Sequence, residues 1–82
     1  MYRILTQDKN RALIETIADS YVDGYTVTLT YGVWKREHEF SLALDFVDVA
    51  EELVFLVAKE IKEANEQESV LVIHFPSTST FV

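Results

Sequence analysis

The chain has 82 residues, a formal net charge of −7 and no cysteine, so it has room for one domain with a modest core. The lack of cysteine excludes disulfides and thiolate metal sites, and it fits a reducing compartment. A protein that binds duplex DNA or RNA needs a basic footprint to displace counterions from phosphate, and this acidic composition predicts no such binding.

The first part of the chain predicts a strand, a helix and a second strand. Residues 2–6 form a short β candidate, and Gly24 stands where a helix would end in the left-handed conformation. Between them, apolar residues recur at helical spacing: Leu13, Ile14, Ile17, Ala18 and Tyr21. From Tyr25 to Tyr31 large apolar residues alternate strictly with threonines, which is the pattern of a half-buried strand.

The second part predicts a strand, a helix and a final strand. Residues 40–46 alternate again, and residues 32–39 connect the two alternating runs as a hairpin. Asp48 and Glu51 have the spacing of a capping box at the start of a helix. Its inward residues are expected to be Leu53, Leu56, Val57 and Ile61. The nearly continuous apolar run 70–75 indicates a strand buried on much of both faces.

The element order βαββαβ predicts an α+β fold, a ferredoxin-like sandwich with two helices on one face of an antiparallel sheet, as a single domain over residues 1–82. The helices are expected to cover these residues of the hairpin: Tyr25, Val27, Leu29, Tyr31, Phe40, Leu42, Leu44 and Phe46. Either Val70 and Val72, or Leu71, Ile73 and Phe75, must then join the open face. An exposed apolar face marks an interface, so we expect a homo-oligomer, a dimer or higher.

The chain shows no membrane signal. Its longest apolar run, 53–58, is far shorter than the roughly 20 residues needed to span a bilayer. The first residues lack the charged start and apolar stretch of a signal peptide. We therefore expect a cytoplasmic protein of a bacterial cell, or of a cell infected by a virus.

No catalytic or metal-binding motif is recognisable. His38 and His74 have no histidine partner at helical spacing, and a zinc site needs three or four converging ligands, so we expect no metal and no cofactor. Ser41 and Ser69 lack the Gly-x-Ser-x-Gly turn of a nucleophile. The two glycines cannot form a phosphate-binding loop. The sequence therefore predicts a protein that is not an enzyme.

One cluster in the hairpin combines the only tryptophan, Trp34, with the only adjacent basic pair, Lys35 and Arg36. An aromatic ring can stack on a base, while the two cations could contact phosphate. The alternative is a hairpin with a packing tryptophan and solubilising charges at its tip.

Four short segments together resemble a family of small phage and bacterial proteins with no assigned catalytic activity. They are Asp23-Gly24-Tyr25-Thr26, Gly32-x-Trp34, Glu39-x-Ser41-Leu42 and Gln67-Glu68-Ser69-Val70-Leu71. The resemblance covers roughly residues 20–82 and implies a phage-type accessory protein. Its pattern singles out these positions of this chain: Trp34, Glu39, Ser41, Gln67, Glu68 and Ser69.

Our leading hypothesis is a non-enzymatic protein that counters host defence by sequestering a small nucleotide-derived signalling molecule as a homo-oligomer. Trp34 would stack, Lys35 and Arg36 would contact phosphate, and Gln67 to Ser69, with Glu39 and Ser41, would supply polar recognition. The alternatives are an acidic inhibitor of a host defence protein (anti-CRISPR-like), and a small enzyme whose site is shared between subunits. In that enzyme the base would be one of His38, Glu39 and Glu68. A structural partner without a ligand also remains open.

Overall fold

The computed structural model describes residues 1–76, so residues 77–82, the end of the region that carries the family resemblance, lie outside the described part, as does the side chain of Trp34. The order βαββαβ is confirmed. The elements are β1 (Tyr2–Gln7), α1 (Arg11–Asp19), β2 (Thr26–Trp34), β3 (Glu37–Phe46), α2 (Glu51–Ala64) and β4 (Leu71–His74).

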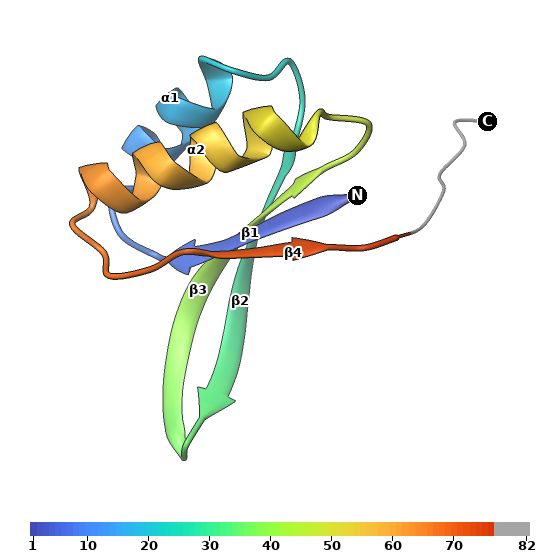
Figure 1. Ribbon diagram of the computed structural model, residues 1–82. Helices are drawn as coiled ribbons and strands as arrows, with labels where there is room; N and C mark the ends of the chain where they lie inside the picture. Colours follow the sequence, from blue (N-terminus) through green and yellow to red (C-terminus); the bar gives the residue numbers. More distant parts are fainter. Residues whose placement is uncertain (77–82) are drawn as a thin grey trace.

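The strands form one antiparallel sheet in the order β2-β3-β1-β4, and both helices lie over the same face of it (Figure 1). This is the predicted ferredoxin-like α+β arrangement. In the register, Ile4 pairs with Leu44 and with Val72. Even-numbered residues of β1, β3 and β4 therefore share the helix-facing side with odd-numbered residues of β2.

The core lies between that face and the two helices. Its fully buried members from the sheet are Ile4, Leu42, Leu44 and Phe46, and those from the helices are Ile14, Ala18, Val54, Val57 and Ile61. The expectation that Leu56 points inward is wrong, because Leu56 is 44% exposed. The buried stripe of α2 follows Val54, Val57, Ala58 and Ile61, which is helical spacing displaced to one side of Leu56.

Both helix boundaries differ from the expected ones. The capping box is absent: the residue before α2 is Ala50, with no side-chain hydrogen bond to the helix, and Asp48 itself is left-handed with φ 56°. Gly24 has no positive φ, because α1 already ends at Asp19 and Ser20 caps it in a helical conformation. Within residues 1–76, neither helix is long and apolar enough to cross a membrane.

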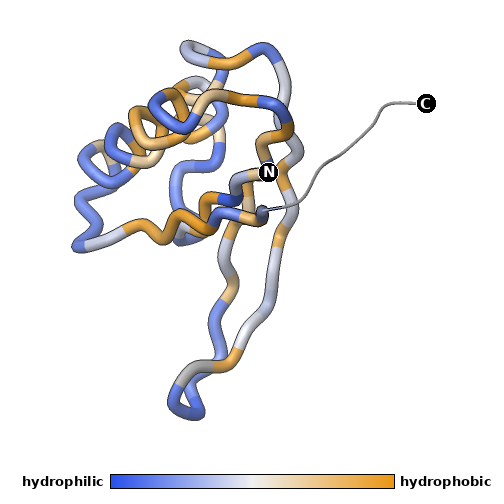
Figure 2. Tube along the Cα trace, turned by 45° about the vertical axis from the view of Figure 1, so that its right-hand side comes forward, coloured by the Kyte–Doolittle hydropathy of each residue, from blue (hydrophilic) through white to orange (hydrophobic). Residues whose placement is uncertain are grey.

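The β2–β3 hairpin extends beyond the rest of the sheet. β2 and β3 pair continuously from Thr26 opposite Asp45 to Trp34 opposite Glu37, whereas β1 pairs with β3 only as far as Ser41. The outer half therefore projects away from the helices and ends in a hydrophilic tip (Figures 1 and 2). Large apolar residues on its helix-facing side are more than half exposed: Leu29, Tyr31, Val33 and Phe40.

The expected coverage of Leu29, Tyr31 and Phe40 by the helices is consequently wrong, although these residues do lie on the predicted side of the hairpin. At the other edge, the prediction that β4 is buried on much of both faces is also wrong. Leu71 is 57% exposed on the open face, while Val70 and Val72 pack against the core. The open face thus receives Leu71, Ile73 and Phe75 from β4.

The hairpin turn contains backbone strain that substitution can relieve. Lys35 and Arg36 form a two-residue turn with φ 50° and 66°, a geometry that Asn-Gly adopts at lower cost. We expect the double variant Lys35→Asn/Arg36→Gly to raise the free energy of unfolding by about 1–2 kcal/mol in urea denaturation. The matched control Lys35→Gln/Arg36→Gln removes the same two charges but does not introduce residues that adopt a positive φ at low cost. An equal gain in the control would show that strain is not the cause.

Candidate functional site

A polar hollow of about 300 Å³ lies on the open face where β1 ends and β4 begins, beside the longer β3. Four of the predicted site residues line it, two from β3 and two from the segment before β4: Glu39, Ser41, Gln67 and Ser69. Leu5, Thr6, Gln7 and Leu71 complete the lining. The antiparallel sheet order is what brings these two distant segments of the chain together.

Hydrogen bonds to β1 fix Gln67 at the rim of the hollow. The Thr6 hydroxyl donates to Gln67 Oε1 at 3.0 Å, and Gln67 Nε2 donates to Thr6 Oγ1 at 2.9 Å. Thr6 is only 4% exposed, so these bonds satisfy a polar group that burial would otherwise penalise. The side-chain amide of Gln67 is therefore held in place before any ligand arrives.

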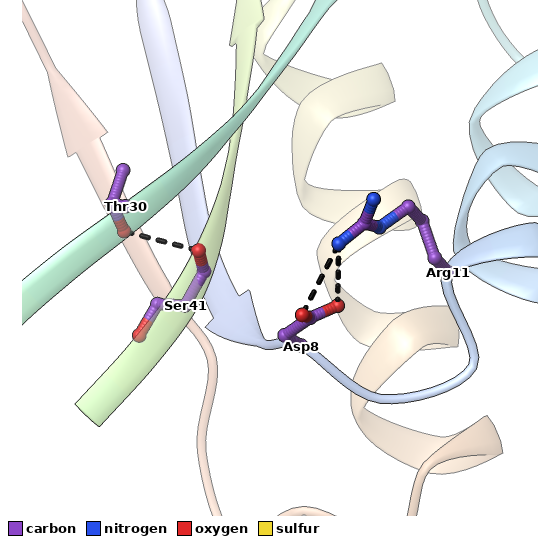
Figure 3. Close-up of polar contacts among 4 residues, drawn as sticks. All are labelled: Asp8, Arg11, Thr30 and Ser41. Atoms are coloured by element: carbon purple, nitrogen blue, oxygen red, sulfur yellow. Dashed lines mark hydrogen bonds and ion pairs between the residues drawn. The ribbon is translucent and has the colours of Figure 1, made fainter.

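Two contacts hold the segments that border the hollow on β3 and after β1. The carbonyl of Ser41 accepts a hydrogen bond from Thr30 Oγ1 at 3.1 Å, across the β2–β3 pair (Figure 3). At the end of β1, the Arg11 guanidinium binds both carboxylate oxygens of Asp8 at 3.1 Å (Figure 3). Both contacts stiffen segments that border the hollow.

A second polar network joins the turn after β1 to the end of α2. Asn65 is 2% exposed; its Nδ2 donates to the Lys9 carbonyl at 3.0 Å, and its Oδ1 accepts from Asn10 Nδ2 at 2.9 Å. The Lys9 ammonium donates to the Asn65 carbonyl at 3.0 Å, two residues before Gln67. Sequence reasoning missed Lys9, which has no motif around it. The fold brings this cation to the end of α2, at the start of the segment that leads to Gln67.

The chemistry of the hollow favours neutral polar groups over phosphate. Among the described residues that line it, Glu39 carries the only charge, and the others offer hydroxyl or amide groups or apolar surface. A carboxylate accepts hydrogen bonds from hydroxyl and amino groups, as a carboxylate does for the ribose hydroxyls in dinucleotide sites. Phosphate placed in the hollow itself would be repelled by Glu39.

The remaining predicted residues lie elsewhere. Lys35 and Arg36 are exposed at the tip of the hairpin, where Arg36 lies about 17 Å from Ser41 along the strand direction at roughly 3.3 Å per residue. The Trp34 backbone pairs with Glu37 at the same tip, and Glu68 is exposed and does not line the hollow. A single chain therefore forms two groups of predicted site residues, one in the hollow and one at the tip.

The three candidate bases are not brought together within one chain. His38 is exposed and its Nδ1 is hydrogen-bonded to the Tyr31 hydroxyl on the helix-facing side of the hairpin. Glu39, the next residue along the strand, belongs to the opposite face. Within residues 1–76, no group of three or more histidine, aspartate and glutamate side chains is arranged to hold a metal ion.

A second hollow, of about 540 Å³, lies at the opposite end of the sheet, between the loops that precede β2 and α2. Asp23, Asp45 and Asp48 are among its lining residues, so it is unsuited to an anionic ligand. Asp45 is paired with Arg3 at 2.6 Å. The Tyr25 hydroxyl donates to Asp19 at 2.7 Å, and burial, followed by this hydrogen bond, raises the pKa of Tyr25 to about 12.

No protein-family model matches the sequence, and no curated protein matches it either. The resemblance to phage and bacterial proteins therefore stays a prediction, and the assignment of the site rests on geometry.

Replacing Asn65 should loosen the rim of the hollow. In Asn65→Leu the Lys9 carbonyl and the Asn10 amide lose their partners, so we expect the free energy of unfolding to fall by about 1–3 kcal/mol. Urea denaturation followed by circular dichroism measures this change. Glu68→Gln, at an exposed position of the same loop, is the control and should have little effect. A loss of less than about 0.5 kcal/mol in Asn65→Leu would contradict the anchoring role.

The raised pKa of Tyr25 predicts a loss of stability in strong alkali. The ordinary tyrosine pKa is about 10, so the protonated phenol stabilises the fold fully below pH 10, and this contribution disappears as the pH rises toward about 12. Stability measured between pH 10 and 12 should therefore fall less steeply in Tyr25→Phe than in the parent chain. Equal slopes would show that Tyr25 ionises alike in the folded and unfolded states.

Proposed function

We propose that this chain is a non-enzymatic binding protein that holds a small nucleotide-derived molecule in the hollow of Glu39, Ser41, Gln67 and Ser69, and sequesters it as a homo-oligomer. The observation that supports the proposal is the convergence of these four side chains from two separate segments. A carboxylate, hydroxyls and a fixed amide together can bind the ribose hydroxyls and a base edge. The nucleoside part of the ligand would therefore occupy the hollow.

The phosphate part would lie outside the hollow, toward a cation. Lys9 is the candidate in the same chain, because its ammonium contacts the carbonyl of Asn65, two residues before Gln67. Lys35 and Arg36 would take part only for a ligand that extends along the hairpin, or from another copy. Stacking by Trp34 stays a prediction.

The biological setting is a wider hypothesis that rests on the family resemblance. A phage-type accessory protein can counter host defence by removing a messenger from solution, and this requires tight binding without turnover. Recovery of the bound molecule in chemically unchanged form would fit sequestration. Conversion of the molecule over time would favour the alternative of an enzyme with a site shared between subunits.

Calorimetric titration with cyclic oligonucleotides and cyclic ADP-ribose isomers tests the proposal. For the ligand that binds, we expect Glu39→Gln to weaken the affinity by about 10-fold or more, since hydrogen bonds to a charged group contribute about 1.5–3 kcal/mol. Glu37→Gln is the matched control. The substitution removes the same charge from the same face of β3, at a residue that lies outside the hollow. No binding across the panel, or equal losses in both variants, would contradict the proposal for these ligands.

A second candidate function, an acidic inhibitor that binds a host defence protein, is supported by the outer face of α2. Phe55 and Leu56 are 50% and 44% exposed and line a depression of about 470 Å³ together with Glu51, Glu52 and Lys59. An apolar pair beside acidic residues suits a partner with a basic rim. This function predicts that Phe55→Ala abolishes protein binding, that binding weakens as salt rises, and that ligand titration at the hollow is unchanged.

A further inference from the structure

β2 is an edge strand without the usual protection of an edge. In the described part of the chain the sheet order leaves its outer side without a strand partner, and it pairs with β3 over nine consecutive residues. Edge strands of monomeric proteins are normally short, bulged, or interrupted by lysine or proline. Residues 25–34 contain no charged residue and no proline, and every second residue from 26 to 30 is a threonine. β4, the other edge, has only four residues.

The helix-facing side of the same hairpin is apolar and uncovered. Leu29, Tyr31, Val33 and Phe40 are 51–58% exposed, and the rings of Tyr31 and Phe40 lie 5.1 Å apart, so they form one continuous surface. This surface adjoins the unpaired edge, since three of the four residues belong to β2 itself. A partner that pairs with the edge would therefore also lie beside the apolar surface.

We propose that the partner is a second copy of this chain, with β2 pairing antiparallel to the β2 of its twin about a two-fold axis at Thr30. The inference specifies the interface of the homo-oligomer and in that respect rests on the proposed function. The axis at Thr30 pairs all nine residues of the strand, Thr26 opposite the partner's Trp34 and Leu29 opposite the partner's Tyr31. The two four-stranded sheets become one eight-stranded sheet with all helices on one side.

Charge complementarity favours this register. Two copies, each with a net charge of −7, repel one another over most of their surfaces, but the β2 edge carries no charge. With the axis at Thr30, the exposed Arg36 at one hairpin tip reaches the residues that precede β2 in the partner, where the partner's Asp23 is exposed. The two-fold axis makes this contact twice.

The register also brings the exposed apolar surface next to the partner's core. The projecting outer half of one hairpin lies beside the inner half of the partner's β2, where the partner's Tyr25 and Val27 pack against the core beneath the helices. The exposed Tyr31 and Val33 of one copy thus lie next to the part of the partner's sheet that the partner's own helices cover. The hollow is lined by β1, β3 and the segments around Gln67 and Leu71, so it stays outside the interface.

A single introduced cysteine tests the register, because the chain has none of its own. Only a residue on the two-fold axis lies opposite itself, where the Cα atoms of a directly opposed antiparallel pair are about 4.5–5.5 Å apart, within disulfide range. Under mild oxidation we expect Thr30→Cys to form a covalent dimer. Thr26→Cys, on the same face of the same strand, should not, because its neighbour is the partner's Trp34. Failure of Thr30→Cys to crosslink overturns the proposal.

Sedimentation equilibrium tests the interface without crosslinking. Leu29→Lys should raise the dimer dissociation constant at least 10-fold, whereas Leu56→Lys, a matched exposed leucine on α2, should leave it unchanged. Arg36→Glu and Asp23→Arg should each weaken the dimer, and the double variant should recover the affinity. A parent chain that stays monomeric, or a double variant weaker than both single ones, overturns the proposal. Ligand titration at the hollow is measured separately, so failure of either proposal is distinguishable from failure of the other.

Discussion

The unequal lengths of the strands determine most of what is distinctive in this structure. β2 and β3 have nine and ten residues, but β1 has six and β4 has four, and the helices cover only the part where all four strands lie together. β3 continues past the ends of the shorter strands, and the polar hollow lies beside this extension. Beyond that point the hairpin has no neighbouring strand or helix among residues 1–76, which leaves an unpaired edge and an exposed apolar side. The candidate ligand site and the candidate interface thus both follow from the difference in length between the strands.

Hydrogen bonds at the end of the sheet where β1 ends hold the residues around the polar hollow in fixed positions. A loop between a helix and an edge strand would ordinarily be among the less constrained parts of a small domain. Here Asn65 is buried and bonded to the turn after β1, and Gln67 is bonded to Thr6. Because these groups are satisfied only when the loop is in place, the cost of leaving them unpaired holds the rim of the hollow against β1. A rigid rim reduces the entropy lost when a ligand binds.

The sequence predicted the architecture because alternation and helical spacing are local properties. The strict alternation from Tyr25 to Tyr31 identified the strand and its helix-facing side correctly. It could not show that the helices would stop short of Leu29 and Tyr31, since that depends on the lengths of other elements. Likewise the unbroken apolar run 53–58 allows more than one buried stripe, and packing against the sheet selected Val54 and Val57. The sheet order, which follows from the fold type, unites Glu39 with Gln67, but nothing local indicates the role of Lys9 or Asn65.

In the proposed dimer, a second copy of the chain pairs with the outer half of the β2–β3 hairpin. Amide hydrogen exchange, followed residue by residue as the protein concentration is raised through the dissociation constant, tests it most directly. If a second copy pairs with β2, the outward-facing amides of β2 become protected with concentration while those of α2 keep their exchange rates. Exchange in β2 that is independent of concentration would contradict the claim, and the hairpin would then be an edge that this chain leaves open for a different protein.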